Sequence, residues 1–144
     1  MISFTVYGKP EAQGSTRAFI PKGWTRPVIT SASKKQKPWR QQISRAALDA
    51  MIEARQKRLF DREVAIAVKL AFFFRKPKHT PKKTTFKTTK PDCDKLARCV
   101  LDSLSGTVFV DDSQVVDAQI QKFFGDPERV EITVVPLYGV SEVE

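Results

Sequence analysis

The sequence predicts an α+β fold, in which a mixed, mainly antiparallel sheet packs against two main helices in a single compact domain. One observation is the length of 144 residues, which suits one domain able to bury about two thirds of its unfolded surface. A second is the order of hydrophobic periods, which reads strand, loop, helix, strand, loop, helix, strand, strand. No internal repeat is visible, so residues 1–144 are interpreted as one domain.

The first half alternates between short apolar segments and basic ones. Residues 2–7 alternate apolar and polar side chains, which predicts a half-buried strand. Residues 8–30 are rich in glycine, proline and basic residues and predict a flexible loop or loose hairpin. A helix is expected from Pro38 to near Arg58, because Pro is tolerated at a first helical position and apolar residues then recur at helical spacing. Those apolar residues are Trp39, Ile43, Ala46, Ala47, Ala50 and Met51.

The second half predicts one helix among three strands. Residues 63–74 place apolar side chains at every second position, and residues 94–105 show helical spacing that ends before Gly106. Between them, residues 75–91 predict a flexible basic loop. Residues 115–124 and 129–137 predict two antiparallel strands joined through a turn. The tail, residues 139–144, is expected to fray.

The charge is large and unevenly distributed. The net charge is +9, which indicates a polyanionic partner such as nucleic acid. Residues 1–90 carry 21 Lys and Arg against 5 Asp and Glu, whereas residues 91–144 carry 4 against 11. The acidic third is either an ordinary solvated face or a site that needs carboxylates.

The remaining composition excludes several classes of protein. Cys93 and Cys99 have the wrong spacing for a zinc site and are too few for a disulfide framework, so two reduced thiols are expected. The sequence shows no secretion signal and no apolar run long enough for a membrane span. We therefore expect a cytoplasmic protein without a membrane partner or an organic cofactor.

Two aspartates, Asp92 and Asp94, open the second helix. Residues two apart diverge by roughly 200° on a helix but face the same side of an extended chain. Because Pro91 prevents a helix from running through, Asp92 is expected on an extended entry and Asp94 at the helix start, with their carboxylates converging. A third carboxylate, from Asp112 or Asp111, is expected to be brought near by the helix and its return.

Such carboxylates suit Mg²⁺, which prefers oxygen ligands and activates water for phosphodiester hydrolysis. The alternative is structural. An aspartate at a helix start also caps free N–H groups, and Asp94, Arg98 and Asp102 have the spacing of a solvated ion-pair ladder. Spacing alone leaves both interpretations open.

The basic segments are candidates for phosphate contact, which sets affinity without sequence preference. The alternative is a stretch that only keeps the protein soluble. Phe86 and Trp24 are candidates for stacking on unpaired bases. The candidate cations are Arg17, Lys22, Arg26, Lys76, Lys78, Lys82, Lys83, Lys87, Lys90 and Lys95.

The region from Pro91 to Asp117 resembles the RusA family of Holliday-junction resolvases. The resemblance lies in the motif D-x-D-x-L at residues 92–96, an amphipathic helix that ends in D-x-L at residues 102–104, and the turn D-D-x-Q-V-V at residues 111–116. This ordered set covers about a quarter of the chain and is far more specific than D-x-D alone.

The resemblance implies a homodimeric, Mg²⁺-dependent endonuclease, with Mn²⁺ as a possible substitute, that makes paired symmetric nicks in four-way branched DNA. It implies metal-binding and catalytic roles for Asp92, Asp94 and Asp112, with Asp111 adjacent. A twofold dimer suits a substrate that needs two symmetric cuts. A phage or prophage setting in bacteria is also implied.

The chain departs from the family pattern at two positions. Lys95 stands where well-known members have Asn, and Arg98 stands where they have a functionally important Lys. Arg can contact a phosphate but is a poor proton donor, so an acid role at position 98 is disfavoured.

The leading hypothesis is therefore a structure-selective DNA endonuclease acting in recombination or repair. One alternative is a non-catalytic nucleic-acid-binding protein. Another is a metal-dependent nuclease of broader specificity for branched DNA or RNA.

Overall fold

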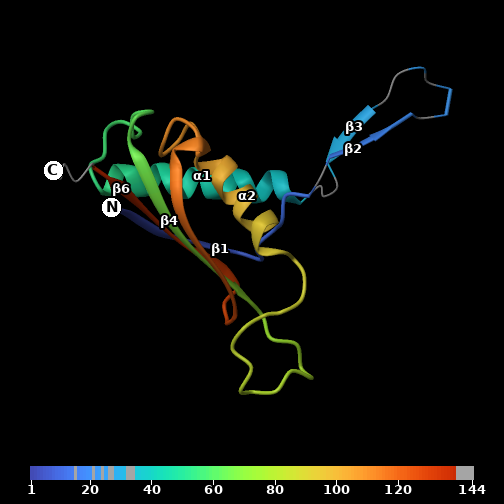
Figure 1. Ribbon diagram of the computed structural model, residues 1–144. Helices are drawn as coiled ribbons and strands as arrows, with labels where there is room; N and C mark the ends of the chain where they lie inside the picture. The colour runs from blue at the N-terminus through green and yellow to red at the C-terminus, as the bar shows by residue number, and fades with distance from the viewer. Residues whose placement is uncertain (15, 21, 24, 26–27, 32–34, 139–144) are drawn as a thin grey trace.

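The computed structural model describes all residues except 15, 21, 24, 26–27, 32–34 and 139–144, and it has a four-stranded sheet with helices over one face (Figure 1). This architecture confirms the predicted α+β class. In chain order the elements are β1 (Ile2–Tyr7), β2 (Thr16–Phe19), β3 (Val28–Ser31), α1 (Gln36–Glu53), β4 (Ala65–Phe74), α2 (Cys93–Leu104), the 3₁₀ turn η1 (Asp112–Gln114), β5 (Val115–Phe124) and β6 (Arg129–Leu137).

The sheet order is β1-β6-β4-β5. β6 pairs antiparallel with both β1 and β4, whereas β4 pairs parallel with β5. β5 and β6 run in opposite directions, as predicted, but they do not pair, because β4 lies between them. The turn that joins these two strands is therefore not that of a paired hairpin, and α2 serves as the crossover that the parallel strands β4 and β5 require.

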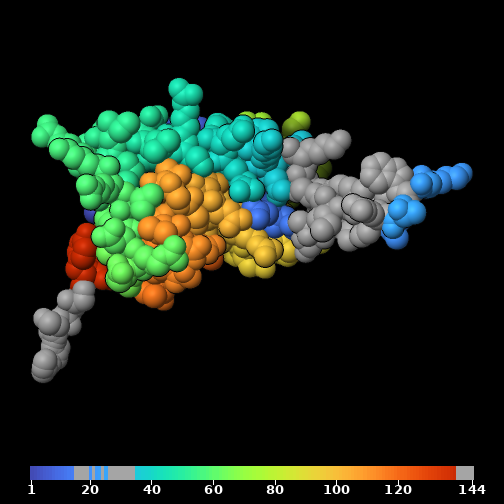
Figure 2. Space-filling view, turned by 90° about the horizontal axis from the view of Figure 1, so that it is seen from above, coloured from blue at the N-terminus to red at the C-terminus, as the bar shows by residue number. Residues whose placement is uncertain are grey.

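The core lies between the sheet and the helices. In β4 the side chains at even positions 66 to 74 are buried, as the period of two predicted. α1 covers this face with Trp39, Ile43 and Ala47, and α2 covers it with a buried face of its own. Seen from above, α1 in cyan and α2 in gold to orange form one layer (Figure 2). The buried residues of α2 are Leu96, Ala97, Cys99, Val100, Ser103 and Leu104.

The two helices differ from the predicted ranges at their ends. α1 begins two residues before Pro38 and stops at Glu53, five residues before the predicted end. It stops there because Arg55 takes a positive φ of 57°, and its N–H donates to the Ile52 carbonyl in a tightened last turn. α2 lies one residue earlier than predicted. Gly106 follows its C-cap with φ of 79°, the left-handed conformation that favours glycine.

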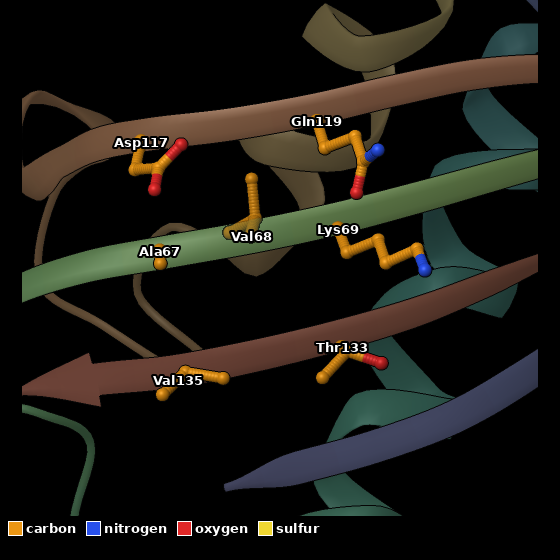
Figure 3. Close-up of a pocket in the computed structure, with 7 residues that line it drawn as sticks. All are labelled: Ala67, Val68, Lys69, Asp117, Gln119, Thr133 and Val135. Atoms are coloured by element: carbon orange, nitrogen blue, oxygen red, sulfur yellow. The ribbon is translucent and has the colours of Figure 1, made fainter.

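Among the described residues, no helix covers the second face of the sheet. Lys69, Asp117, Gln119 and Thr133 project from it around a shallow hollow whose floor includes Ala67 (Figure 3). β2 and β3 form a separate antiparallel ribbon, which agrees with the predicted loose hairpin in residues 8–30. Within the described ranges no helix has the length and apolar character needed to cross a membrane.

Candidate functional site

The start of α2 presents two exposed carboxylates. Asp92 is the N-cap residue with extended backbone (φ −75°, ψ 146°), and Asp94 lies in the first turn, as predicted. The Asp92 side chain makes no capping hydrogen bond to the helix. Its Oδ2 atom instead lies 3.7 Å from Lys95 Nζ. The Asp92 side chain therefore does not cap the helix, and capping does not explain why an aspartate stands here.

The ion-pair ladder along α2, the structural alternative for these acids, does not form among the described residues. Asp94, Arg98 and Asp102 make no ion pair with one another there. Asp102 Oδ2 accepts from Gln13 Nε2 at 2.6 Å, and the Gln13 backbone N–H donates to the Lys95 carbonyl at 3.0 Å. The segment before β2 is thus fastened along α2, while Asp94 and Arg98 remain exposed.

The second acidic pair forms a rigid turn after α2. Asp111 is the N-cap of η1, and its Oδ2 accepts from the Ser113 N–H at 3.0 Å. Hydrogen bonds from Ser113 lower the pKa of the Asp111 carboxyl below its ordinary value. Asp112 begins η1 and is exposed. Asp111 is therefore occupied by capping, whereas Asp112 projects freely.

A buried glutamine fixes this turn to the body. Gln114 Nε2 donates to the carbonyls of Asp61 (2.6 Å) and Val64 (3.0 Å). Its Oε1 accepts from the N–H groups of Val110 (2.8 Å) and Asp111 (2.9 Å). Gln114 belongs to the D-D-x-Q-V-V motif, and no role was predicted for it. The available signal was a polar residue directly before the apolar start of a strand.

The two acidic pairs lie at opposite ends of α2. A helix of 12 residues is about 18 Å long at about 1.5 Å per residue. Asp92 and Asp94 mark its beginning, in yellow, and the turn holding Asp111 and Asp112 follows its end, in orange (Figures 1 and 2). Among the described residues of one chain no three Asp, Glu, His or Cys side chains could hold one metal ion.

The expectation that α2 and its return bring the acids together within one chain is therefore wrong. The physical reason is that α2 spans the distance between them without folding back. The donor chemistry suits Mg²⁺, but the arrangement within a single chain does not.

The basic loop between β4 and α2 is partly folded onto the sheet. Lys76 Nζ donates to the carbonyls of Pro81 and Lys82, at 3.1 and 2.9 Å. Lys87 Nζ lies 5.3 Å from the centre of the Phe74 ring. Burial, followed by the charge of Lys122, lowers the pKa of Lys87. Most of the predicted phosphate-binding cations here are exposed, namely Lys78, Lys82, Lys83 and Lys90.

The other predicted cations have mixed outcomes. Lys22 is exposed and Lys95 is half-buried beside Asp92. Arg17 lies in β2, but its side chain is not described, and Arg26 and Trp24 lie outside the described residues. Of the two predicted reduced thiols, Cys93 is half-buried and Cys99 buried. Burial raises the pKa of the Cys99 thiol to about 11.

An aromatic and cationic cluster sits beside the start of α2. Phe86 is 56% exposed, and its ring lies 5.3 Å from the Phe123 ring, which stacks on Phe73 at 5.2 Å. The Arg129 guanidinium lies 3.8 Å over Phe73. The sequence reading selected Phe86 but missed Arg129.

Lys122 links this cluster to the acidic pair. Its Nζ donates to the carbonyls of Thr89 (2.7 Å) and Pro91 (2.8 Å). The far end of β5 is therefore fastened directly to the entry of α2. Lys122 had no sequence signal, because a lysine in a strand is ordinarily a solvated residue.

Comparison with known proteins identifies relatives over nearly the whole chain. Residues 8–135 match the family model described as Endodeoxyribonuclease RusA. The chain is also 33% identical over 141 residues to the uncharacterized protein YqaN of Bacillus subtilis (strain 168). That match covers 92% of this chain and 94% of the relative.

Proposed function

The chain belongs to the RusA family of endodeoxyribonucleases, and from this premise we propose that it resolves four-way DNA junctions by paired symmetric nicks. The cofactor proposed is Mg²⁺, with Mn²⁺ as a substitute. The active form proposed is a homodimer in the cytoplasm of a bacterial or phage-infected cell, where it serves recombination or repair.

One observation carries this proposal. Asp92 and Asp94 are exposed at the start of α2, and Asp92 makes no capping bond to the helix it precedes. A cationic loop and an exposed aromatic ring adjoin them. Carboxylates without a structural task beside a surface that attracts phosphate are what a phosphodiester nuclease requires.

The proposed metal-binding residues are Asp92, Asp94 and Asp112, with Asp111 as a further donor. Because α2 separates the two acidic pairs in one chain, this assignment needs a second chain to bring them together. A homodimer supplies that second chain and gives two equivalent sites. Arg98, exposed one turn beyond Asp94, is proposed to contact the reacting phosphate.

The cations are proposed to hold the DNA backbone. Lys78, Lys82, Lys83 and Lys90 are exposed on the loop between β4 and α2, and Lys22 is exposed between β2 and β3. Lys76 and Lys87 lie against Phe124 and support the same surface. Such contacts set affinity and salt dependence but carry no sequence information.

The test is cleavage of a synthetic four-way junction with Mg²⁺, compared with EDTA. We expect paired nicks only with the metal. Asp92→Asn, Asp94→Asn and Asp112→Asn should each abolish nicking while junction binding persists. Asp49→Asn, an exposed acid on α1, is the matched control and should cut normally. Full activity of Asp94→Asn would refute the assignment.

Competition with linear duplex, single strands and RNA separates the alternatives. Equal cleavage of all of them would indicate a nuclease of broader specificity. Tight binding without cleavage under any metal would indicate a non-catalytic nucleic-acid-binding protein.

A further inference from the structure

β5 is an edge strand with a free stretch of backbone. β4 pairs with one of its edges. On its other edge, the Phe124 N–H donates to the Thr85 carbonyl at 2.8 Å, and the Lys122 carbonyl accepts from the Lys87 N–H at 3.2 Å. For residues 116–121, no described segment other than β4 hydrogen-bonds to the backbone. Because outward groups alternate along a strand, those of Ala118 and Ile120 face this free edge, like those of Lys122 and Phe124.

This edge carries little of the protection that edge strands usually have, namely one charge, at Asp117, and a register shift at Val116. Edge strands are commonly protected by lysine or proline. Residues 116–121 contain neither, and the one lysine of β5, Lys122, turns its Nζ to the carbonyls of Thr89 and Pro91. The side chain of Val116 is 64% exposed beside this open backbone. Unpaired N–H and C=O groups of this kind are a template for another strand.

We propose that β5 pairs antiparallel with β5 of a second copy, about a twofold axis that passes beside Ala118. The two sheets then continue as one of eight strands, four from each copy. The axis stands perpendicular to the sheet, so the helices of both copies lie on the same face.

Two considerations select this register, namely repulsion between like charges and the part of the β5 edge that is already hydrogen-bonded. An axis at Asp117 would set two like charges directly opposite each other, which is destabilising. An axis at Gln119 would set the strand residue Val116 against Lys122 of the partner subunit, whose carbonyl already accepts a bond, whereas an axis at Ala118 sets only Gln114 of η1, outside β5, at that position. With the axis at Ala118, Asp117 of each copy faces Gln119 of the partner subunit, which gives two equivalent pairs. Both side chains project from the face of the sheet that carries no helix (Figure 3).

The separation of the acids supports the same pairing, and this step rests on the proposed function. Asp112 stands six residues before Ala118, and Lys122, which holds Pro91, stands four residues after it. At about 3.3 Å per strand residue and about 2 Å per residue of η1, these are about 16 Å and about 13 Å on opposite sides of the axis. The twofold rotation exchanges the sides. Asp112 of each copy is thereby brought to the level of Asp92 and Asp94 of the partner subunit.

A cross-linking experiment tests the axis. Opposed residues that exchange hydrogen bonds have Cα atoms about 5.5 Å apart, within the range a disulfide spans. Ala118→Cys in a Cys93→Ser background should therefore form a covalent dimer on mild oxidation. Leu48→Cys, exposed on the outer side of α1, is the control and should form no covalent dimer. Cross-linking of Ala118→Cys no faster than Leu48→Cys would overturn the proposal.

A charge exchange tests the register without cysteine. Gln119→Glu sets Glu against Asp117 of the partner subunit at two symmetric positions and should weaken the dimer roughly 2- to 30-fold. Asp117→Lys combined with Gln119→Glu should restore it. Gln41→Glu on α1 is the matched control, and sedimentation is the measurement. A double variant weaker than Gln119→Glu alone would refute this register.

Mixed dimers separate this inference from the function itself. Asp94→Asn and Asp112→Asn chains, each inactive alone, should regain single-strand nicking when mixed, because one of the two shared sites is then intact. Mixed dimers that cross-link but fail to nick, while the wild type cuts, would overturn the proposed placement of the acids. If Ala118→Cys cross-links but the wild type cuts no junction, the proposed interface stands and the proposed function is refuted.

Discussion

Arg98 is the residue whose role differs most from what helical spacing suggests. It lies four residues from both Asp94 and Asp102, yet it pairs with neither, since Asp102 is engaged by Gln13. An exposed guanidinium without a described acidic partner keeps its donors for an anion.

We therefore expect Arg98→Ala to slow nicking roughly 10²-fold, the typical cost of losing one donor to a developing anion. Junction binding should change little. Single-turnover cleavage is the measurement, and Arg45→Ala on α1 is a control of the same residue type. Arg98→Lys should retain part of the rate, since it keeps the charge. An unchanged rate in Arg98→Ala would place the residue outside the chemistry.

Gln114 is a structural residue within the acidic motif. Its amide is buried and satisfies four backbone groups, so truncation leaves those groups unpaired. Gln114→Ala should lower the free energy of unfolding by about 1–3 kcal/mol. Thermal unfolding measures this, with Gln41→Ala, exposed on α1, expected to stay within about 0.5 kcal/mol of the wild type. Equal stability of the two variants would contradict the bonding described.

Asp111 makes the stability of the same turn dependent on pH. Because its folded pKa is lowered by the Ser113 bonds, its stabilising contribution is present above the ordinary aspartate pKa of 3.8. That contribution is lost as pH falls through the lowered value. The destabilisation caused by Asp111→Ala should therefore be largest at neutral pH and fade in strong acid. Thermal unfolding of both proteins at pH 7 and pH 2.5 checks this, and a difference that grows in acid would contradict it.

At the scale of elements, local patterns predicted most of the secondary structure. The ranges of β5 and β6 were predicted to the residue, and that of α2 to within one residue. The spacing of the apolar residues and the positions of the glycines determine where these elements begin and end. The neighbours of β5 were not predicted. The turn at residues 125–127 fits a hairpin equally well, although the succession β4-α2-β5 is typical of a parallel crossover.

The site was predictable in its residue types but not in its assembly. Asp92, Asp94 and Asp112 were identified from spacing and resemblance, whereas their separation follows from the straight course of α2. Lys122 and Arg129 act through contacts distant in sequence, with Pro91 and Phe73. No local pattern encodes such contacts.

The loop between β4 and α2 offers an aromatic platform next to the acidic pair. The backbone on each side of Phe86 is held in place, because the Thr85 carbonyl and the Lys87 N–H both hydrogen-bond to β5. Its exposed ring is therefore available to a base that has left its stack, as at a junction. We expect Phe86→Ala to reduce the preference for four-way junctions over linear duplex about 5- to 150-fold, the equivalent of about 1–3 kcal/mol.

Competition binding measures that preference: unlabelled four-way junction and unlabelled linear duplex each compete with labelled junction. Phe86→Trp keeps a stacking surface and should preserve it. Loss of affinity for both DNAs in equal measure would show that Phe86 only supports the loop.

At the scale of the molecule, the charge is divided between a basic first part and an acidic last part. Residues 1–90 carry 21 Lys and Arg against 5 Asp and Glu, and residues 91–144 carry 4 against 11. A polyanion is attracted by the first part, while the acids of the last part include a pair at each end of α2. We expect a linear duplex to be held through phosphate contacts to this basic part.

Salt dependence measures how many of those contacts the loop makes. Each phosphate neutralised on duplex DNA contributes about 0.9 to the slope of log affinity against log salt. Lys82 and Lys83 are exposed at the loop tip, so their joint replacement by alanine should reduce the slope by about 1.8. Lys57 and Arg58, equally exposed after α1, form the matched pair, and their replacement should leave the slope unchanged. If both pairs reduce the slope alike, DNA is held by net charge rather than by this loop.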